Sequence, residues 1–148
     1  MKCEIMSLKE IKNIGFIGLG VMGSPMCNNL LKNKKWHIIV HDLDNSKEKE
    51  LEKNGASVAK NLNELFDVAD MIITCLPGGD FVREIYLGEK KIVSEINPDK
   101  LIIDMSTSQP DLMIELNKLI TKKGSFFADA PIALSLIHIS EPTRLHGI

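Results

Sequence analysis

The sequence predicts an α/β domain built on a doubly wound parallel sheet. Short apolar runs of strand length alternate along the chain with segments of helical periodicity. The first apolar run passes directly into glycines at the Gly-x-Gly-x-x-Gly spacing, and a helical pattern follows at once. An acidic residue closes the second apolar run, about 20 positions beyond the glycines. These observations together favour parallel strands joined by right-handed helical crossovers.

The glycine stretch joins an expected strand at residues 14–17 to an expected helix at residues 21–31. Gly18 allows a sharp turn out of the strand, Gly20 lets the backbone approach a pyrophosphate, and Gly23 lets the helix pack close to the strand. The N-terminus of that helix offers free N–H groups and a partial positive charge to phosphates. Such a spacing also arises by chance, so the residues around it must decide whether it binds a dinucleotide.

Asp42 closes the second expected strand, residues 36–41. In a dinucleotide-binding fold, an acid here accepts hydrogen bonds from the adenosine ribose hydroxyls. Its charge would repel the additional phosphate of NADP, so we expect NAD to be preferred over NADP. The alternative is a helix cap for residues 46–53, a role that Asp44 or Asn45 suits better.

The remaining elements continue the alternation of strands and helices. We expect further strands at residues 56–59, 71–76, 101–104 and 125–128, and helices at residues 46–54, 62–68, 80–86 and 110–123. Ligands of open α/β sheets bind beyond the carboxyl ends of the strands, so Leu76 and Pro77 should face the cofactor.

Several reactive side chains lie near these strand ends. Cys75 has no base nearby in the sequence, so we interpret it as a packed thiol rather than a nucleophile. The hydroxyls of Ser106, Thr107 and Ser108 follow the fifth strand and suit binding of substrate or nicotinamide. Ser108 also suits capping of the helix that Pro110 opens, and different residues can serve the two purposes.

Composition places the chain among ordinary globular proteins. Its 148 residues are one domain's worth, with 44% hydrophobic and 26% charged residues and a net charge of −2. That charge gives no reason to expect nucleic acid or an anionic membrane as a partner. No apolar run is long enough to span a bilayer and no signal peptide is visible, so we expect a cytoplasmic location. Cys3, Cys27 and Cys75 fit neither a disulfide framework nor a zinc site, and we expect no metal.

Four separated stretches resemble the β-hydroxyacid dehydrogenases, the family of 3-hydroxyisobutyrate dehydrogenase and tartronate semialdehyde reductase. They are residues 15–30, Leu76-Pro77, residues 104–107 and residues 129–131, in the order that the family has them. The resemblance implies a Rossmann-type domain of an enzyme that passes hydride between NAD and a small 3-hydroxy acid, of the 3-hydroxyisobutyrate or 2-hydroxy-3-oxopropionate type. It also implies that the full-length parent is a homo-oligomer.

The resemblance also implies roles for individual residues. The dinucleotide would contact Gly18, Leu19, Gly20, Val21, Met22, Gly23, Leu76, Pro77 and Thr107. Ser106 would help to hold the substrate carboxylate. Relatives that use NADP carry Asn-Arg-Thr where this chain has His41-Asp42-Leu43, which resembles the NAD type. The related 6-phosphogluconate dehydrogenases carry Asp-Gly-Gly-Asn-Ser at residues 104–108 and are less similar.

The chain departs from the family pattern after Ile132. Family members continue through a Ser-Gly-Gly element into a helical domain that supplies the catalytic lysine, so we assign no catalytic residue here. Residues 134–144 match the translation of a transposon-end adapter used in sequencing libraries. We therefore expect a chain truncated before the helical domain, with a leader, a dinucleotide-binding domain and a non-native tail at residues 1–13, 14–132 and 133–148.

Two functions are compatible with these features. The first is part of an NAD-dependent 3-hydroxyacid dehydrogenase, inactive by itself because half of the site is missing. The second is a non-catalytic NAD-binding module, since one fold hosts many functions.

Overall fold

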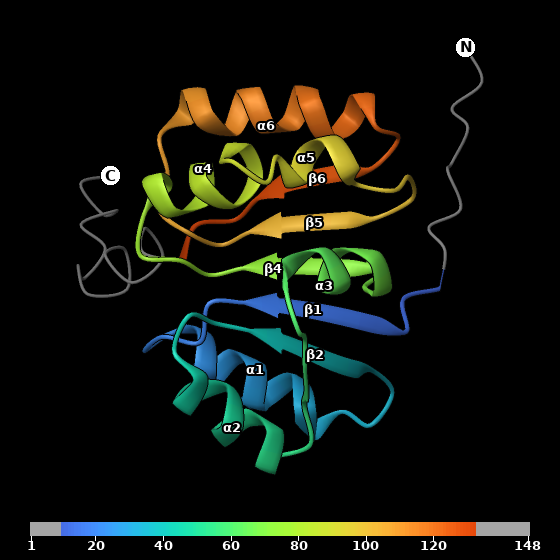
Figure 1. Cartoon of the computed structure of the whole chain (residues 1–148), viewed down its shortest axis with the longest axis vertical. Helices are drawn as coiled ribbons and strands as arrows, with labels where there is room; N and C mark the ends of the chain where they lie inside the picture. Colours follow the sequence, from blue (N-terminus) through green and yellow to red (C-terminus); the bar gives the residue numbers. More distant parts are fainter. Residues whose placement is uncertain (1–9, 133–148) are drawn as a thin grey trace, which may run out of the picture.

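The computed structural model describes residues 10–132. Six parallel strands form one sheet in the order β3-β2-β1-β4-β5-β6 (Figure 1). The strands are β1 (Asn13–Ile17), β2 (His37–His41), β3 (Ser57–Val58), β4 (Met71–Thr74), β5 (Leu101–Asp104) and β6 (Phe126–Asp129). The chain starts in the middle of the sheet, builds outward to β3, and returns to the other side of β1 with β4. The predicted doubly wound parallel sheet is therefore confirmed.

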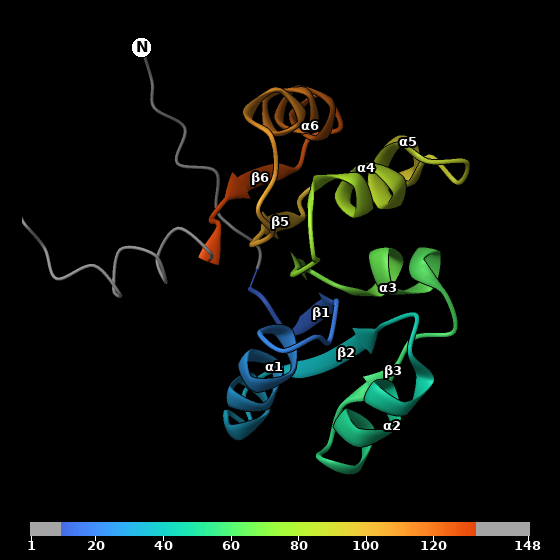
Figure 2. The same cartoon turned by 90° about the vertical axis from the view of Figure 1, so that its left-hand side faces the viewer.

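Helices cover both faces of this sheet. They are α1 (Gly23–Lys32), α2 (Asn45–Lys53), α3 (Leu62–Val68), α4 (Gly79–Leu87), α5 (Ile92–Glu95) and α6 (Pro110–Lys122). Figure 2 shows α1 on one side of the sheet, with α3 and α4 on the other. The two faces have separate hydrophobic cores, because successive residues of a strand point to opposite faces. Phe16 and Val40 lie in the core beneath α1 and α2, whereas Ile17 and Ile39 lie in the core beneath the other helices.

Most elements lie where the sequence places them. The strand at 101–104 and the helix at 62–68 have the predicted bounds, and Asp44 caps α2 by accepting a hydrogen bond from the backbone N–H of Ser46. The sequence missed α5, which is a single turn of four residues and too short to show a helical period. The ends of the other strands and helices differ from the predicted ends by at most two residues.

The prediction that Ser108 caps the helix at Pro110 is wrong. Gln109 is the N-cap residue of α6, and no side chain accepts a hydrogen bond there. The hydroxyl of Ser108 instead donates to Asp104 Oδ2 at 3.4 Å. The buried charge of Asp104 attracts this donor away from the helix terminus.

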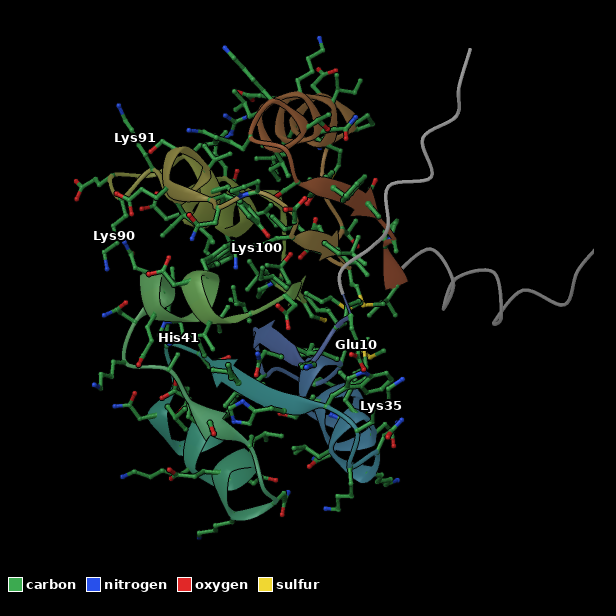
Figure 3. All side chains as sticks on the ribbon, turned by 90° about the vertical axis from the view of Figure 1, so that its right-hand side faces the viewer. Glu10, Lys35, His41, Lys90, Lys91 and Lys100 are labelled. Atoms are coloured by element: carbon green, nitrogen blue, oxygen red, sulfur yellow. The ribbon has the colours of Figure 1, made fainter. Side chains whose placement is uncertain are left out.

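The amino-terminal edge of the sheet holds a lysine in the interior. Lys100 is 7% exposed, and its ammonium group donates to the carbonyl oxygens of Ala69 at 2.7 Å and Asp67 at 3.2 Å. Figure 3 shows Lys100 inside the fold, whereas Lys91 points outward. The ammonium thereby satisfies carbonyls at the C-terminal end of α3, where cations are favourable.

The expected leader and tail lie largely outside the described residues. Of the leader, Ile11 packs against the core under α1 and α2, and Asn13 begins β1. The whole of the adapter-like stretch at residues 134–144 falls outside the description. Among residues 10–132, the helices are all too short or too polar to cross a membrane.

Candidate dinucleotide-binding site

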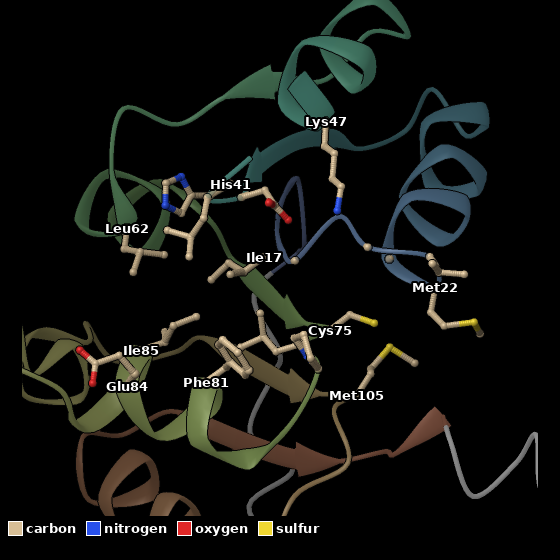
Figure 4. A pocket seen from close by; sticks show the side chains of 18 of the residues that line it. Ile17, Met22, His41, Lys47, Leu62, Cys75, Phe81, Glu84, Ile85 and Met105 are labelled. Carbon is tan, nitrogen blue, oxygen red and sulfur yellow. The ribbon is translucent and has the colours of Figure 1, made fainter. Parts of the chain in front are cut away.

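A cleft of about 720 Å³ lies at the carboxyl ends of the strands (Figure 4). Side chains and backbone that follow β1, β2, β4 and β5 form its walls. This is the position at which the strand order reverses, and open α/β sheets bind ligands there. Of the residues predicted to bind cofactor, those lining the cleft are Gly18, Gly20, Val21, Met22, Gly23, Asp42, Leu76, Pro77 and Thr107. Leu19 and Ser106 lie behind its surface.

The glycine turn has the backbone that its spacing predicts. Gly18 has a φ of +95°, and a Cβ at this position would collide with the carbonyl oxygen of Cys75. A Cβ at Gly23 would collide with the carbonyl oxygen of Gly18, so the first turn of α1 can approach the strand only without a side chain. The space around a Cβ at Gly20 is empty to 4 Å. The sharp turn at Gly18 and the close packing at Gly23 are thus confirmed, and the approach of a pyrophosphate to Gly20 stays a prediction.

The Asp42 carboxylate ties the end of β2 to this turn. Its Oδ2 accepts from the backbone N–H of Leu19 at 2.6 Å, and its Oδ1 accepts from the N–H of Asp44 at 2.8 Å. A carboxylate has about four acceptor positions, so two remain for other donors. Leu19 itself is 1% exposed, and its side chain lies in the core under α1 and α2. The sequence placed Asp42 at the site but did not predict its bond to the glycine turn.

A second layer supports Asp42 from behind. The backbone N–H of Asp42 donates to Glu48 Oε1 at 2.9 Å, and Glu48 is only 7% exposed. The same Glu48 oxygen lies 3.2 Å from His41 Nδ1. The first turns of α2 therefore hold the end of β2 in place, which keeps the Asp42 carboxylate directed at the cleft.

The sequence also missed an apolar wall and a cation of the cleft. Phe81 and Leu43 are 52% and 92% exposed, and Leu62 and Ile85 line the same region. Figure 4 shows Lys47 extending from α2 toward the glycine turn. Large apolar side chains that stay exposed beside a cleft indicate a ligand-binding surface. Only Leu43 lies close after a strand end, whereas Leu62, Phe81, Ile85 and Lys47 belong to helices, so the sequence carried no local signal for most of this wall.

A buried carboxylate lies beneath the opposite end of the cleft. Asp104 is fully buried, and its Oδ1 accepts from Thr74 Oγ1 at 2.7 Å and from Ser106 Oγ at 2.7 Å. The hydroxyl oxygen of Ser106 in turn accepts from the backbone N–H of Leu76 at 2.9 Å. Ser106 is 2% exposed, and its only hydroxyl proton is directed at Asp104. Its expected contact with a substrate carboxylate stays a prediction.

The thiol of Cys75 lies at the floor of the cleft. Burial, and then the negative charge of Asp104, raise the pKa of this thiol above its ordinary value. Cys75 therefore stays protonated at neutral pH, where only the thiolate is a good nucleophile. This supports the interpretation of a packed thiol. Among residues 10–132, there is also no cluster of three or more His, Cys, Asp or Glu arranged to hold a metal ion.

A family comparison agrees with this geometry. The family described as the NAD binding domain of 6-phosphogluconate dehydrogenase matches residues 13–134. The chain belongs to this family. The glycine turn, the cleft and Asp42 all lie within the matched residues.

Individual members of the family are similar along most of this chain. Mitochondrial 3-hydroxyisobutyrate dehydrogenase of Mus musculus is 39% identical over 120 residues, which are 81% of this chain and 36% of that protein. The 3-sulfolactaldehyde reductase of Escherichia coli K12 is 39% identical over 122 residues, 80% of this chain and 40% of that protein. The chain thus spans well under half the length of these relatives.

Solved structures give the same result. The 3-hydroxyisobutyrate dehydrogenase of Mycobacterium tuberculosis superposes with a TM-score of 0.72 at 30% identity, over 82% of this chain and 40% of that one. Psf3 in complex with NADP+ and 2-OPP superposes with a TM-score of 0.72 at 26% identity, over 77% and 40%. The family is therefore one of NAD(P)-binding oxidoreductases.

Proposed function

We propose that this chain is the NAD-binding part of an oxidoreductase that transfers hydride between NAD and a small 3-hydroxy acid, of the 3-hydroxyisobutyrate or 2-hydroxy-3-oxopropionate type. The observation that carries the proposal is the meeting of the glycine turn and Asp42 at one cleft, joined by the 2.6 Å bond between Leu19 N and Asp42 Oδ2. The names of the relatives support the substrate class.

From one end of the cleft to the other, its residues suit the adenosine, the pyrophosphate and the nicotinamide of a dinucleotide in turn. The two unused acceptor positions of Asp42 would receive the adenosine ribose hydroxyls, with the adenine between Leu43 and Phe81. The pyrophosphate would cross Gly20 and the N-terminus of α1. The nicotinamide would then lie past the reversal of strand order, against Pro77 and Thr107. When bound, the nicotinamide accepts or donates the hydride, and these residues would orient it.

NAD over NADP is the second part of the proposal. A phosphate on the adenosine ribose would meet the Asp42 carboxylate at close range, and like charges destabilise each other strongly where water is partly excluded. Lys47 lines the same part of the cleft and offsets some of this repulsion. We therefore expect a preference for NAD rather than exclusion of NADP.

We propose that catalytic turnover also needs a part of the protein that corresponds to the rest of the relatives' length, which this chain does not span. A positioned general acid or base contributes about a hundredfold to ten-thousandfold to rate. The test titrates the 148-residue chain with NADH by fluorescence and assays NADH formation with 3-hydroxyisobutyrate and glycerate. The same assays on the gene extended with its genomic sequence are the comparison.

Binding in both proteins, with turnover in the extended one alone, is the expected result. Absence of NADH binding in both would contradict the proposal. Binding without turnover in both would favour a non-catalytic NAD-binding module. Comparable turnover by the 148-residue chain would contradict the requirement for the remaining part.

A cytoplasmic location and a homo-oligomeric parent are further proposals. The mouse relative is named as mitochondrial, so the location needs a direct measurement. Fractionation of cells that express the extended gene with a C-terminal tag would test the first, and light scattering of the purified extended protein would test the second.

A further inference from the structure

Two loops of the cleft are joined by one chain of hydrogen bonds. Leu76 and Pro77 follow β4, and Met105 and Thr107 follow β5, and all four line the cleft. The Leu76 N–H donates to Ser106 Oγ at 2.9 Å, and Ser106 Oγ donates to Asp104 Oδ1 at 2.7 Å. The chain of bonds thus runs from the backbone of one loop, through the second loop, to a carboxylate in the core.

Asp104 determines which group donates and which accepts in each of these hydrogen bonds. A carboxylate only accepts hydrogen bonds, so the single proton of the Ser106 hydroxyl must be the one donated to it. The hydroxyl oxygen is then free only to accept, and the Leu76 N–H fills that position. Pro77 follows directly and has no N–H, so Leu76 supplies the backbone donor on this side of the proline.

The buried charge also makes the arrangement stiff. Asp104 accepts from Thr74 Oγ1 and from the backbone N–H of Ser106 as well as from the two hydroxyls of Ser106 and Ser108. A buried carboxylate that lost one of these donors would be left partly unsatisfied, at high cost in a medium of low dielectric. The start of α4 also lies close to the second loop, since a Cβ added at Gly79 would meet Ser108 Cα at 3.4 Å. These contacts tie the conformation of one loop to that of the other.

We infer that Asp104 and Ser106 are positioning residues, which hold the Leu76–Pro77 backbone and Thr107 in the arrangement that receives the nicotinamide half of the cofactor. This inference rests on the proposed function. It assigns Ser106 a role through Leu76 that differs from direct contact with a substrate carboxylate. The adenosine half lies against Asp42 and does not depend on these bonds.

The experiment compares two ligands and two variants. NADH carries both halves of the cofactor, whereas ADP-ribose lacks the nicotinamide. Ser106→Ala removes the hydroxyl under the cleft. Ser125→Ala is the matched control, because Ser125 is also a buried serine, whose hydroxyl accepts from Lys100 N at 3.1 Å and donates to the carbonyl of Asn97 at 2.9 Å, at the opposite edge of the sheet.

Ser106→Ala should weaken NADH binding by about fivefold to tenfold, the effect of one hydrogen bond to a buried group, and change ADP-ribose binding by less than about twofold. Ser125→Ala should change neither, although both variants lose stability. Equal weakening of both ligands by Ser106→Ala, or weakening of neither, would overturn the inference. Absence of binding of both ligands to the unmutated chain would instead overturn the proposed function, and the positioning role with it.

A measurement on the unmutated chain keeps the inference testable if Ser106→Ala does not fold. Hydrogen exchange at the Leu76 amide, followed by NMR without ligand, should be slowed to the range of β-strand amides. A Leu76 amide that exchanges as fast as an exposed loop amide would show that the loop is not held before the cofactor arrives, and would overturn the inference.

Discussion

Asp42 combines a contact to the protein with an expected contact to the cofactor. Its carboxylate already accepts from the Leu19 N–H of the glycine turn, and the residue lines the cleft. Its replacement therefore removes two interactions of different kinds. Binding measurements and stability measurements separate them.

Asp42→Ala should bind NADH more weakly and narrow the difference between NADH and NADPH, because both the ribose acceptor and the repulsive charge are lost. It should also lower the free energy of unfolding by about 1–2 kcal/mol, since the Leu19 N–H loses its partner. Fluorescence titration with both cofactors and urea unfolding measure the two effects. Equal dissociation constants of NADH and NADPH in the unmutated chain would contradict the assignment of Asp42.

The two described cysteines differ in access to reagents. Cys75 lines the cleft, whereas Cys27 lies on the buried face of α1, where burial raises its pKa to about 12. The neutral thiol of Cys27 is thus favoured by folding, so its contribution to stability is present at neutral pH and is lost as the pH rises through the range of the folded pKa. Both thiols should react slowly at pH 7.

Bound NADH should slow the alkylation of Cys75 by iodoacetamide severalfold by covering its thiol in the folded protein. Cys27 is fully buried and reacts only when the fold opens, so NADH should slow its alkylation only through the added stability of the native state. Peptide mass spectrometry measures the alkylation of Cys75 and Cys27 on different peptides, and distinguishes both from Cys3. Without ligand, the Cys75 rate should keep rising above the pH at which a free thiol levels off, since its pKa is raised. A Cys75 rate that NADH does not change would contradict the placement of the cofactor.

At the scale of elements, the three glycines of the turn between β1 and α1 have different roles: two are needed for the fold, and the third is expected to matter for binding. Gly18 and Gly23 are required by the backbone itself, because a Cβ at either would collide with a carbonyl oxygen. Gly20 has open space around it and a φ outside the left-handed region. A side chain at Gly20 is therefore compatible with the fold, and we expect it to conflict only with a bound dinucleotide.

Gly20→Val should leave the circular dichroism spectrum unchanged and reduce NADH affinity by at least about a hundredfold, because the branched side chain occupies the space of the pyrophosphate. Normal binding by Gly20→Val would show that the stretch is only a strand-to-helix turn.

At the scale of the whole molecule, the cofactor should stabilise the fold by linkage. A ligand that binds only the native state at a hundred times its dissociation constant adds about 2.7 kcal/mol to the free energy of unfolding. Thermal unfolding at increasing NADH should show a rising midpoint, whereas NMN, which lacks the adenosine half, should give a much smaller shift at the same concentration. Equal shifts would contradict a contribution from Asp42.

Sequence periodicity sufficed for the sheet and for nearly every helix, because each strand and helix buries a face of regular spacing. It also found the parts of the site that a local motif encodes, the glycine turn and Asp42. It could not find α5, which is too short for a period, or the burial of Lys100, which depends on carbonyls 31 and 33 residues away. The bonds from Ser106 to Leu76 and from Asp42 to Leu19 likewise join residues far apart in sequence.

The position of β1 in the middle of the sheet has a consequence for the order of assembly. During synthesis from the N-terminus, β1 can pair with β2 as soon as His37–His41 has left the ribosome, but its other edge stays open until Met71–Thr74 arrives. The cleft lies across that last junction, so a nascent chain has no complete binding site while it consists only of its first three strands. Capture of the cofactor can thus occur only after the two halves of the sheet have closed on each other.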